Sequence, residues 1–364
     1  MVKKINNNSK RLLLFFSIII IYLLAWPISV DPVSWESPPD TRKDPIFSIN
    51  QKLSGIKIFW EDDGYFGPED IVLNDGKIYV GYENGVIKNT DGIFSNTKGR
   101  PLGMAFDAEG NLIIADAIQG LISIDMNGTI NTLSRKSNSD NIPLNFVDDL
   151  DIASDGKIYF SDASSKYGYG SDRLELFEHT PNGRLLVFDP ITQKTTTLLS
   201  GLYFANGVAL APDESYVLVN ESSLGRVRRY WLAGPNTGET EVFSYIYGNI
   251  GWEGWVLPDN ITYNDEGIFW VATYFGPVVG IDTSGQIVYE LNFDFNSFGE
   301  NTSVIQYNDS LYLGTLHDSH IGVIPLPEEL LSFSSESNAS QLVTCLLYTS
   351  PSPRDRTRSR MPSS

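Results

Sequence analysis

The sequence has almost no cysteine, little histidine and few basic residues. Cys345 is the single cysteine of the 364 residues, and there are three histidines. One cysteine forms no internal disulfide and does not supply the cysteine set of a structural zinc site. The 26 Lys and Arg stand against 45 Asp and Glu, which gives a net charge of -19. Because binding to nucleic acid needs a basic surface, we expect no nucleic-acid partner.

The N-terminus contains an uncharged, apolar run. A basic cytosolic stub, residues 1–11, precedes an uncharged segment, residues 12–30. About 20 such residues cross a bilayer as a helix, and cations on one side keep that side cytosolic. We therefore expect a transmembrane signal anchor and a single-pass type II membrane protein of the secretory pathway (endoplasmic reticulum or endomembrane, vacuole or plasma membrane). The body would be lumenal or extracellular. A cleaved signal peptide is the alternative, but Ala25-Trp26-Pro27 is a poor cleavage site.

The C-terminus departs in composition from the acidic, aromatic body. Residues 343–364 are rich in Ser, Pro and Arg. This segment resembles translated adaptor sequence, so we interpret it as a non-native tail and leave it out of the fold. The alternative is a genuine disordered basic tail.

Sequons support a lumenal body, because N-linked glycans are added in the secretory pathway. Asn260 heads one sequon, but we expect it to bind metal, and a glycan there would exclude that role. We predict glycosylation at the other five, Asn127, Asn220, Asn301, Asn308 and Asn338.

A hairpin pattern recurs six times after a linker and lead-in of residues 31–65. In each copy a short apolar strand, a turn with Asp or Asn and mostly Gly, and a β-branched or aromatic strand follow one another, as in residues 70–80 and 150–160. Asp-Gly between alternating strands is a strong hairpin signal. The body shows no long helical periodicity. We therefore predict an all-β fold, a six-bladed β-propeller over residues 66–342, preceded by the transmembrane helix.

Propeller geometry brings the starts of the six first strands to the mouth of the central channel. Their carboxylate and amide oxygens are ligands that suit Ca²⁺, and no His stands at these positions. The alternative is that Asp and Asn merely begin strands after turns. The residues at these starts are Glu69, Pro101, Asp148, Asp149, Asn206, Asp259, Asn260 and Thr302.

Several stretches carry a family resemblance. Residues 99–103, 146–152, 156–164, 183–186, 201–215, 228–232 and 257–261 closely resemble the strictosidine synthase-like family. More distantly, the chain is similar to paraoxonases and to the gluconolactonase/senescence-marker group. The resemblance implies a six-bladed propeller, often with a signal anchor.

The resemblance also implies a Ca²⁺ site. Glu69, Asn206, Asp259 and Asn260 match the family's ligand motifs. The blade-3 motif, usually Asn-Asp, is Asp148-Asp149 here, and we expect Asp148 to be the fifth ligand. The added charge would tighten metal binding and weaken the bound metal as a Lewis acid.

Three functions are compatible with these residues. We favour a Ca²⁺-dependent hydrolase of a small apolar ester or lactone (arylesterase or lactonase type), with His317 and Asp149 as catalytic residues. The alternative is a non-enzymatic binding propeller with structural Ca²⁺. Alkaloid condensation is disfavoured, because the residue 302–306 strand lacks the carboxylate that strictosidine synthase uses.

Further residues belong to the hydrolase hypothesis. Asp116, Asp162 and Glu221 end second strands on the same face as His317. Aromatic residues would line an apolar pocket above the metal, although such residues more often pack blades together. They are Tyr65, Phe66, Tyr203, Phe204, Trp252, Trp255, Tyr274 and Phe275.

Overall fold

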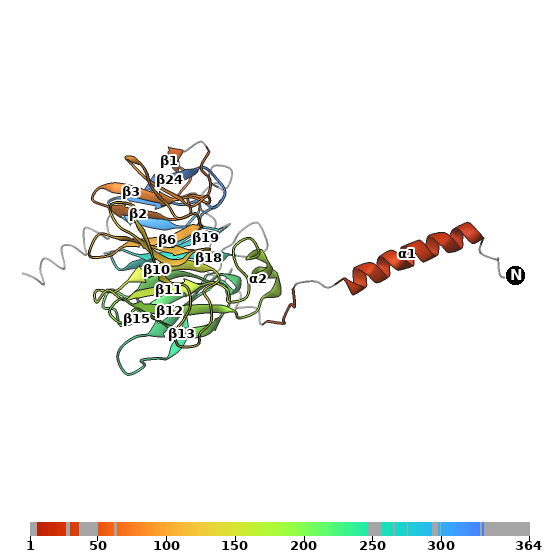
Figure 1. Ribbon diagram of the computed structural model, residues 1–364. Helices are drawn as coiled ribbons and strands as arrows, with labels where there is room; N and C mark the ends of the chain where they lie inside the picture. The colour runs from red at the N-terminus through yellow and green to blue at the C-terminus, as the bar shows by residue number, and fades with distance from the viewer. Residues whose placement is uncertain are drawn as a thin grey trace, which may run out of the picture.

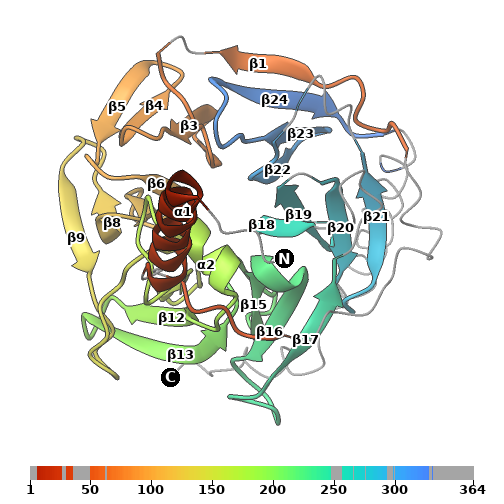
Figure 2. The ribbon, with the colours of Figure 1, turned by 90° about the vertical axis from the view of Figure 1, so that its right-hand side faces the viewer.

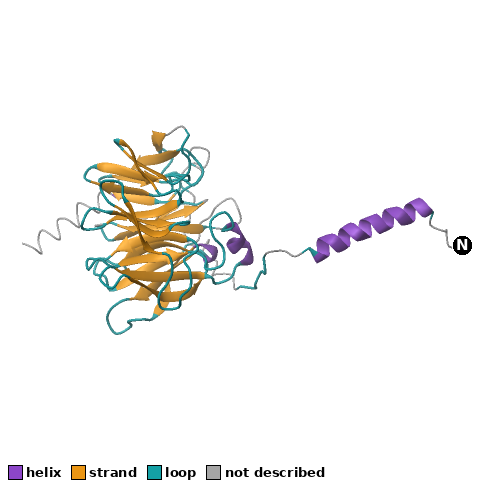
Figure 3. Ribbon diagram, viewed as in Figure 1, coloured by secondary structure: helices purple, strands orange, loops and turns teal. Residues whose placement is uncertain are grey.

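The protein consists of one long N-terminal helix and a six-bladed β-propeller (Figures 1 and 3). The computed structural model describes residues 6–26, 30–35, 50–61, 64–246, 256–264, 266–274, 276–292, 298, 300–327 and 330. The predicted fold class is therefore confirmed. The predicted tail, 343–364, lies outside the described residues, as does the sequon residue Asn338.

Each of the first three blades is an antiparallel sheet of four consecutive strands, with the first strand near the axis and the fourth at the rim (Figure 2). The first is β2 (Ile71–Asn74), β3 (Lys77–Gly81), β4 (Val86–Asn89) and β5 (Gly92–Asn96). The second is β6 (Pro101–Phe106), β7 (Leu112–Asp116), β8 (Gly120–Ile124) and β9 (Ile130–Ser134). The third is β10 (Val147–Ile152), β11 (Ile158–Asp162), β12 (Gly183–Asp189) and β13 (Lys194–Leu202).

The last three blades are also four-stranded antiparallel sheets, but the outer strand of blade 6 is β1 from the N-terminal side. Blade 4 is β14 (Ala205–Leu210), β15 (Tyr216–Glu221), β16 (Arg226–Trp231) and β17 (Thr240–Tyr245). Blade 5 is β18 (Leu257–Tyr263), β19 (Ile268–Tyr274), β20 (Val278–Asp282) and β21 (Ile287–Leu291). Blade 6 is β22 (Val304–Tyr307), β23 (Ser310–Leu313), β24 (His320–Pro325) and β1 (Lys57–Glu61). We call the face where first strands start and second strands end the site face.

The strand β1 closes the propeller. It pairs antiparallel with β24, from Lys57 opposite Val323 to Glu61 opposite His320, and so becomes the outer strand of blade 6. The propeller therefore begins at β1 rather than at residue 66. This closure joins the N-terminal and C-terminal strands of the propeller in one blade.

Local sequence explains the hairpins, and apolar layers hold the blades together. Asp75 and Gly76 connect β2 to β3 with φ of 48° and 73°, the left-handed pair that a two-residue hairpin requires. Between blades 2 and 3, the buried side chains of Ile113 and Leu121 belong to the same apolar cluster as Phe160. Clusters of this kind fill the spaces between neighbouring blades.

The helix α1 (Asn7–Ala25) precedes the propeller. Asn6 caps it by accepting a hydrogen bond from Ser9 N at 2.8 Å. Its residues are exposed, and by its length of 19 residues and its composition it could cross a membrane. A signal sequence near an N-terminus passes the same test. Two short helices lie in loops of the site face, α2 (Arg173–Glu178) between β11 and β12, and the 3₁₀ helix η2 (Ser222–Leu224) after β15.

Candidate functional site

Four first strands have the same irregularity at the site face. Their pairing with the second strand shifts register between Pro101 and Met104, Val147 and Leu150, Ala205 and Val208, and Pro258 and Ile261. A β-bulge leaves residues out of the regular ladder and re-aims their side chains. Each bulge encloses a pair of residues, and blades 1 and 6 have the corresponding pairs just before β2 and β22. The pairs are Glu69-Asp70, Leu102-Gly103, Asp148-Asp149, Asn206-Gly207, Asp259-Asn260 and Thr302-Ser303.

The second member of a pair joins its blade to a neighbouring blade. Asp70 Oδ2 accepts a hydrogen bond from Met104 N of blade 2 at 2.8 Å. Asp149 Oδ2 likewise accepts from Val208 N of blade 4 at 2.7 Å, while its Oδ1 accepts from Leu150 N. Asp149 thus links blade 3 to blade 4. Its catalytic role stays a prediction.

Two of these second members must be glycine. A Cβ added at Gly103 would lie 2.3 Å from Asp149 Oδ1, and one added at Gly207 would lie 2.4 Å from Asp259 O. Neither position has room for a side chain, because the adjacent first strand is too close. The blades therefore meet at a tightly packed inner ring, which fixes the first members of the pairs around the channel.

The first members leave buried oxygens without partners. Glu69, Asp148 and Asn206 are buried, and Asp259 is partly buried. In blade 5 the adjacent Asn260 is also buried. Buried polar atoms are almost always hydrogen-bonded, so a set of exceptions in one place calls for a ligand. The oxygens without a hydrogen-bond partner include Glu69 Oε2, Asp148 Oδ2, Asn206 Oδ1 and Asn260 Oδ1, from four blades.

The carboxyl groups of this ring interact electrostatically. Burial, followed by the charges of Asp259 and Asp148, raises the pKa of Glu69 well above its usual value. Burial and the charge of Asp259 do the same to the pKa of Asp148. Burial raises the pKa of Asp259 to about 7. Like charges held together in a buried channel favour a bound cation.

Arg100 brings one fixed positive charge to this channel. Its side chain is 1% exposed and its Nη1 donates a hydrogen bond to Gly67 O at 2.7 Å. Its charge lowers the pKa of Glu69, Asp148 and Asp259, against the larger effect of burial. Blade 2, whose pair is Leu102-Gly103, thus contributes a cation in place of an oxygen. Sequence analysis missed this role, although an arginine directly before a first strand was the available signal.

The donor set fits Ca²⁺ only if amides take part. Among the described residues, no three His, Cys, Asp or Glu side chains form a group that could hold a metal ion. The unpaired oxygens, however, come from carboxylates and amides together. Ca²⁺ accepts six to eight oxygen ligands of both kinds. Glu69, Asp148, Asn206, Asp259 and Asn260 therefore carry oxygens of the kinds that Ca²⁺ accepts.

The acids that end second strands have a different role. Asp116 Oδ1 accepts hydrogen bonds from Arg100 N, Ile118 N and Gln119 N at 2.8–3.0 Å. Asp162 accepts from Asn145 N and Phe146 N and pairs with buried Arg184. Glu221 accepts from Tyr203 N and pairs with Arg226. These three acids hold the loops of the site face.

A loop from blade 3 crosses the site face. It contains α2, which lies near the axis when the disc is viewed from the side of α1 (Figure 2). Arg173 Nη2 lies 3.2 Å from His317 Nε2 on the blade-6 side, and Tyr169 OH donates to Glu83 Oε1 of blade 1 at 3.1 Å. Contacts this far apart in the chain tie the loop across the mouth of the channel.

His317 is part of that connection. Its Nδ1 lies 3.3 Å from Glu300 Oε2, and its backbone N donates to the same oxygen at 3.1 Å. Tyr274 OH donates to Glu300 Oε1 at 3.0 Å, and burial followed by the Glu300 charge raises the pKa of Tyr274. The His317 side chain is 49% exposed, whereas the first members of the pairs in blades 1, 3 and 4 are buried. Its catalytic role stays a prediction.

The remaining predicted residues have mixed placements. Tyr65 packs on Tyr82 at 5.3 Å and Phe204 on Phe146 at 5.9 Å, whereas Phe66 is exposed. Tyr203 lies 5.5 Å from the ring of His179. Trp252, Trp255 and Phe275 lie outside the described residues.

Two predicted glycosylation sites do not fit the fold. Asn220 and Asn301 are fully buried, and Asn220 Nδ2 donates a hydrogen bond to Asp259 O. A glycan needs that nitrogen exposed, so the folded protein has no room for one at either residue. Asn127 and Asn308 are exposed, as a glycan requires.

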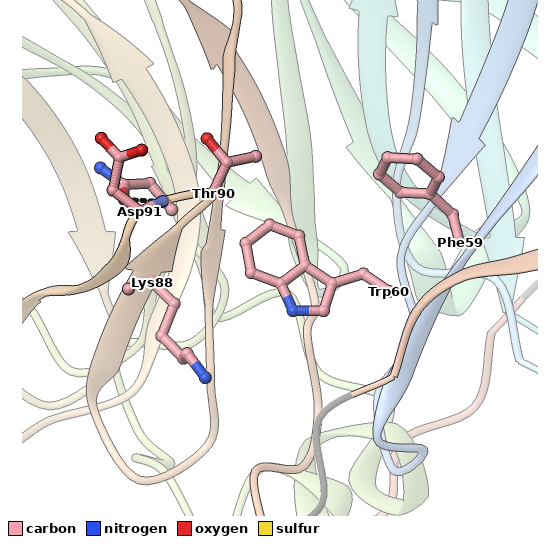
Figure 4. Close-up of a pocket in the computed structure, with 7 residues that line it drawn as sticks. Phe59, Trp60, Lys88, Thr90 and Asp91 are labelled. Atoms are coloured by element: carbon pink, nitrogen blue, oxygen red, sulfur yellow. Dashed lines mark hydrogen bonds between the residues drawn. The ribbon is translucent and has the colours of Figure 1, made fainter.

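A pocket on the outer rim is separate from the channel. It has a volume of about 440 Å³ and lies at the seam between β1 and the β4–β5 hairpin (Figure 4). Its lining residues are Phe59, Trp60, Lys88, Asn89, Thr90, Asp91 and Gly92.

Fold and channel define a class of protein, the six-bladed propellers with an oxygen-lined axial site. The strictosidine synthase family model matches residues 148–235, and the model for the N-terminal part of strictosidine synthase-like proteins matches residues 46–89. The adipocyte plasma membrane-associated protein of Rattus norvegicus is 34% identical over an alignment of 271 residues that covers 69% of this chain and 69% of the relative. The chain therefore belongs to the strictosidine synthase-like family.

The plant relatives are similar over a shorter stretch. The strictosidine synthase-like 3 protein of Arabidopsis thaliana is 40% identical over 177 residues, 48% of this chain and 43% of the relative. The chain spans between 43% and 62% of the length of this and two further Arabidopsis relatives.

Solved structures share the fold at low sequence identity. A gluconolactonase from Xanthomonas campestris has a TM-score of 0.54 and 19% identity, and the match covers 69% of this chain and 82% of that one. Regucalcin from Agrobacterium tumefaciens, a calcium-binding protein, has a TM-score of 0.55 and 14% identity over 72% of this chain and 94% of its own. At these identities the likeness shows the propeller fold alone.

Proposed function

We propose that the protein is a Ca²⁺-dependent hydrolase of small apolar esters or lactones, anchored in a membrane by α1. The observation that carries the proposal is the set of buried oxygens without partners on four blades, at Glu69, Asp148, Asn206 and Asn260. Family membership and the shared fold with a gluconolactonase and a calcium-binding protein support it.

Metal binding and catalysis are assigned to different residues of the chain. Glu69, Asp148, Asn206, Asp259 and Asn260 would hold the cation. A calcium ion bound there supplies a Lewis acid for a carbonyl oxygen. The raised pKa values of Glu69 and Asp148 return toward the ordinary range when their charges are compensated.

Arg100 and His317 act beside this ring. The guanidinium of Arg100 is a fixed charge that favours an anionic oxygen developing in the channel. His317, as the neutral tautomer with its proton on Nδ1 facing Glu300, leaves Nε2 as the atom that accepts a proton from water. Arg173 lies next to Nε2, so the blade-3 loop must shift before His317 acts.

The test is turnover of phenyl acetate and of a lactone by the full chain, with calcium and with chelator. We expect turnover that chelator stops and that Asp259→Ala abolishes. His317→Ala then separates loss of rate from loss of metal, because it should leave calcium binding intact. Turnover at the same rate with calcium and with chelator contradicts the proposal.

One observation favours a second function, a binding propeller with structural calcium. The blade-3 loop is tied across the channel mouth through Arg173 and His317 on one side and Tyr169 and Glu83 on the other. In that case calcium raises thermal stability but no ester or lactone is turned over.

The localisation is also a proposal. A propeller on the lumenal side of α1 predicts glycans at Asn127 and Asn308 and protection from protease in sealed microsomes. A folded propeller that carries no glycans and is cleaved by protease in sealed microsomes would lie on the cytosolic side.

A further inference from the structure

The juxtamembrane segment, residues 30–35, is bound to the site face. Asp31 N donates a hydrogen bond to Glu178 Oε2 at 3.2 Å, and Val33 N donates to Glu178 O at 3.1 Å. The ring of Trp35 lies 4.3 Å from that of His179. All three contacts are made with the end of α2, so the chain that leaves the apolar helix attaches to the loop that crosses the channel.

The attachment point is itself fixed. Glu178 is 2% exposed and accepts hydrogen bonds from Lys166, Tyr167 and Thr180. Although burial raises its pKa, the bonds from Lys166, Tyr167 and Asp31 N lower it to about 2, so Glu178 stays an anion. On the other side of the contact, His179 packs on Tyr203 of the loop before blade 4. The segment is therefore joined to the propeller through a buried residue that is itself hydrogen-bonded to its neighbours.

The reach of the chain places this face near the membrane. The helix α1 ends at Ala25, and the first anchored residue is Asp31. Those few residues span at most about 20 Å when fully extended. Figure 1 shows α1 and α2 on the same side of the disc. If α1 spans a bilayer, the site face is the face next to it.

The site face carries exposed apolar side chains. Phe177, in the last turn of α2, is 72% exposed and directly precedes Glu178. Phe66 and Ile118, in the loops of blades 1 and 2 on the same face, are also exposed. Exposed aromatic residues at a membrane surface insert into the region between head groups and acyl chains. On the opposite face, Ile191 in the β12–β13 turn is 88% exposed and offers a matched control.

We propose that the site face rests on the surface of the bilayer that α1 spans, with Phe177 in the interface, so that the channel receives an apolar ligand from the lipid rather than from bulk water. The contacts of residues 30–35 with Glu178 and His179 hold the site face at the bilayer surface. This inference rests on the proposed membrane anchorage and deepens the proposed function by naming the ligand's source. The binding partner is the lipid bilayer itself.

Two cysteine variants of the full chain test the contact. Phe177→Cys and Ile191→Cys, each with Cys345→Ser, are labelled with an environment-sensitive fluorophore and reconstituted in phosphatidylcholine vesicles with or without brominated acyl chains. We expect bromolipid to quench the label at residue 177 several-fold more than the label at residue 191. Equal quenching, or stronger quenching at residue 191, overturns the inference.

A longer tether tests the role of the juxtamembrane segment. A flexible Gly/Ser insertion after Trp26 should reduce quenching at residue 177, because the face is then free to leave the surface. Unchanged quenching in this variant would show that the short connection between α1 and residues 30–35 does not hold the face at the surface.

The readout needs neither turnover nor calcium, so it fails separately from the hydrolase proposal. Flotation of the vesicles after an alkaline wash tests the anchor in the same preparation. A chain that does not float overturns the anchor and this inference together, whereas a chain that floats with equal quenching overturns this inference alone.

Discussion

Two sets of acidic side chains on the site face differ in their partners. The inner acids, Glu69, Asp148 and Asp259, repel one another and include oxygens without hydrogen bonds. The outer acids, Asp116, Asp162 and Glu221, are fully buried, yet each accepts backbone N–H bonds, and two pair with arginine. Burial alone thus does not mark a ligand site. Asp116 Oδ2 is also without a hydrogen-bond partner. What distinguishes the inner acids is therefore their mutual repulsion, which favours a cation between them.

The largest expected effect comes from the outer set. Asp162→Ala leaves Arg184, whose side chain is 3% exposed, as a buried charge without its main partner. We expect a loss of about 3–5 kcal/mol in the free energy of unfolding, measured by urea denaturation of the full chain in detergent. Calcium should not restore it. A loss below about 1 kcal/mol would show that this pair contributes little.

Substitution of an inner acid should increase the free energy of unfolding, whereas substitution of an outer acid lowers it. Asp148→Asn removes one of several repelling charges and keeps an oxygen ligand. In chelator at pH 7.5 we expect the variant to be more stable than the parent by about 1–3 kcal/mol. Calcium affinity should fall roughly tenfold, since ligand charge sets affinity. Destabilisation in chelator would mean that Asp148 belongs with the structural acids.

Glu290 sharpens the comparison, because it is a buried acid far from the channel. It lies in β21, and burial raises its pKa to about 7. The folded state then binds the proton more tightly than the unfolded state, so stability falls as the pH rises from about 4.5 to about 7. We expect Glu290→Gln to remove about 2 kcal/mol of this fall between pH 5 and pH 8, with or without calcium. If the stability of the parent and of the Glu290→Gln variant changed with pH in the same way, the raised pKa of Glu290 would be contradicted.

The smallest effect concerns the closure of the inner ring. Thr302 Oγ1 donates a hydrogen bond to Glu69 O at 2.8 Å and so links blades 6 and 1. Thr302→Val keeps the shape of the side chain and leaves that carbonyl without its donor. We expect a loss of about 1 kcal/mol in urea denaturation. A parallel loss of calcium affinity would show that the bond also positions the Glu69 carboxylate.

Much of the fold could be predicted from the sequence because each blade has its own local signal. The Asp-Gly turn after Leu73 and the similar turns of later blades identify hairpins within about ten residues. The strand β1 has no such signal, since Lys57–Glu61 pairs with β24 near the other end of the propeller. The short helix α2 is missed for a related reason, because six residues give too little periodicity.

The candidate site was predictable only in part. The strand starts identify Glu69, Asp148, Asn206, Asp259 and Asn260, since propeller geometry brings them together. Side-chain direction depends on the bulges, which the sequence does not reveal. Asp148 and Asp149 are neighbours of one type, yet the first has an unpaired oxygen and the second braces blade 4.

The contacts across the mouth were beyond sequence reasoning. Arg173 and His317 meet because the blade-3 loop reaches across the mouth of the channel to the blade-6 side. The burial of Asn220 is likewise set by tertiary contacts, although its sequon looks like those of exposed Asn127 and Asn308.

The most direct test is a calcium titration of the full chain in detergent by calorimetry, with the Asp148→Asn variant alongside. The inner ring predicts binding to the parent, a higher melting temperature with calcium than with chelator, and weaker binding to the variant. Absence of calcium binding by the folded parent, or equal binding by parent and variant, would contradict the assignment of these oxygens to a cation site.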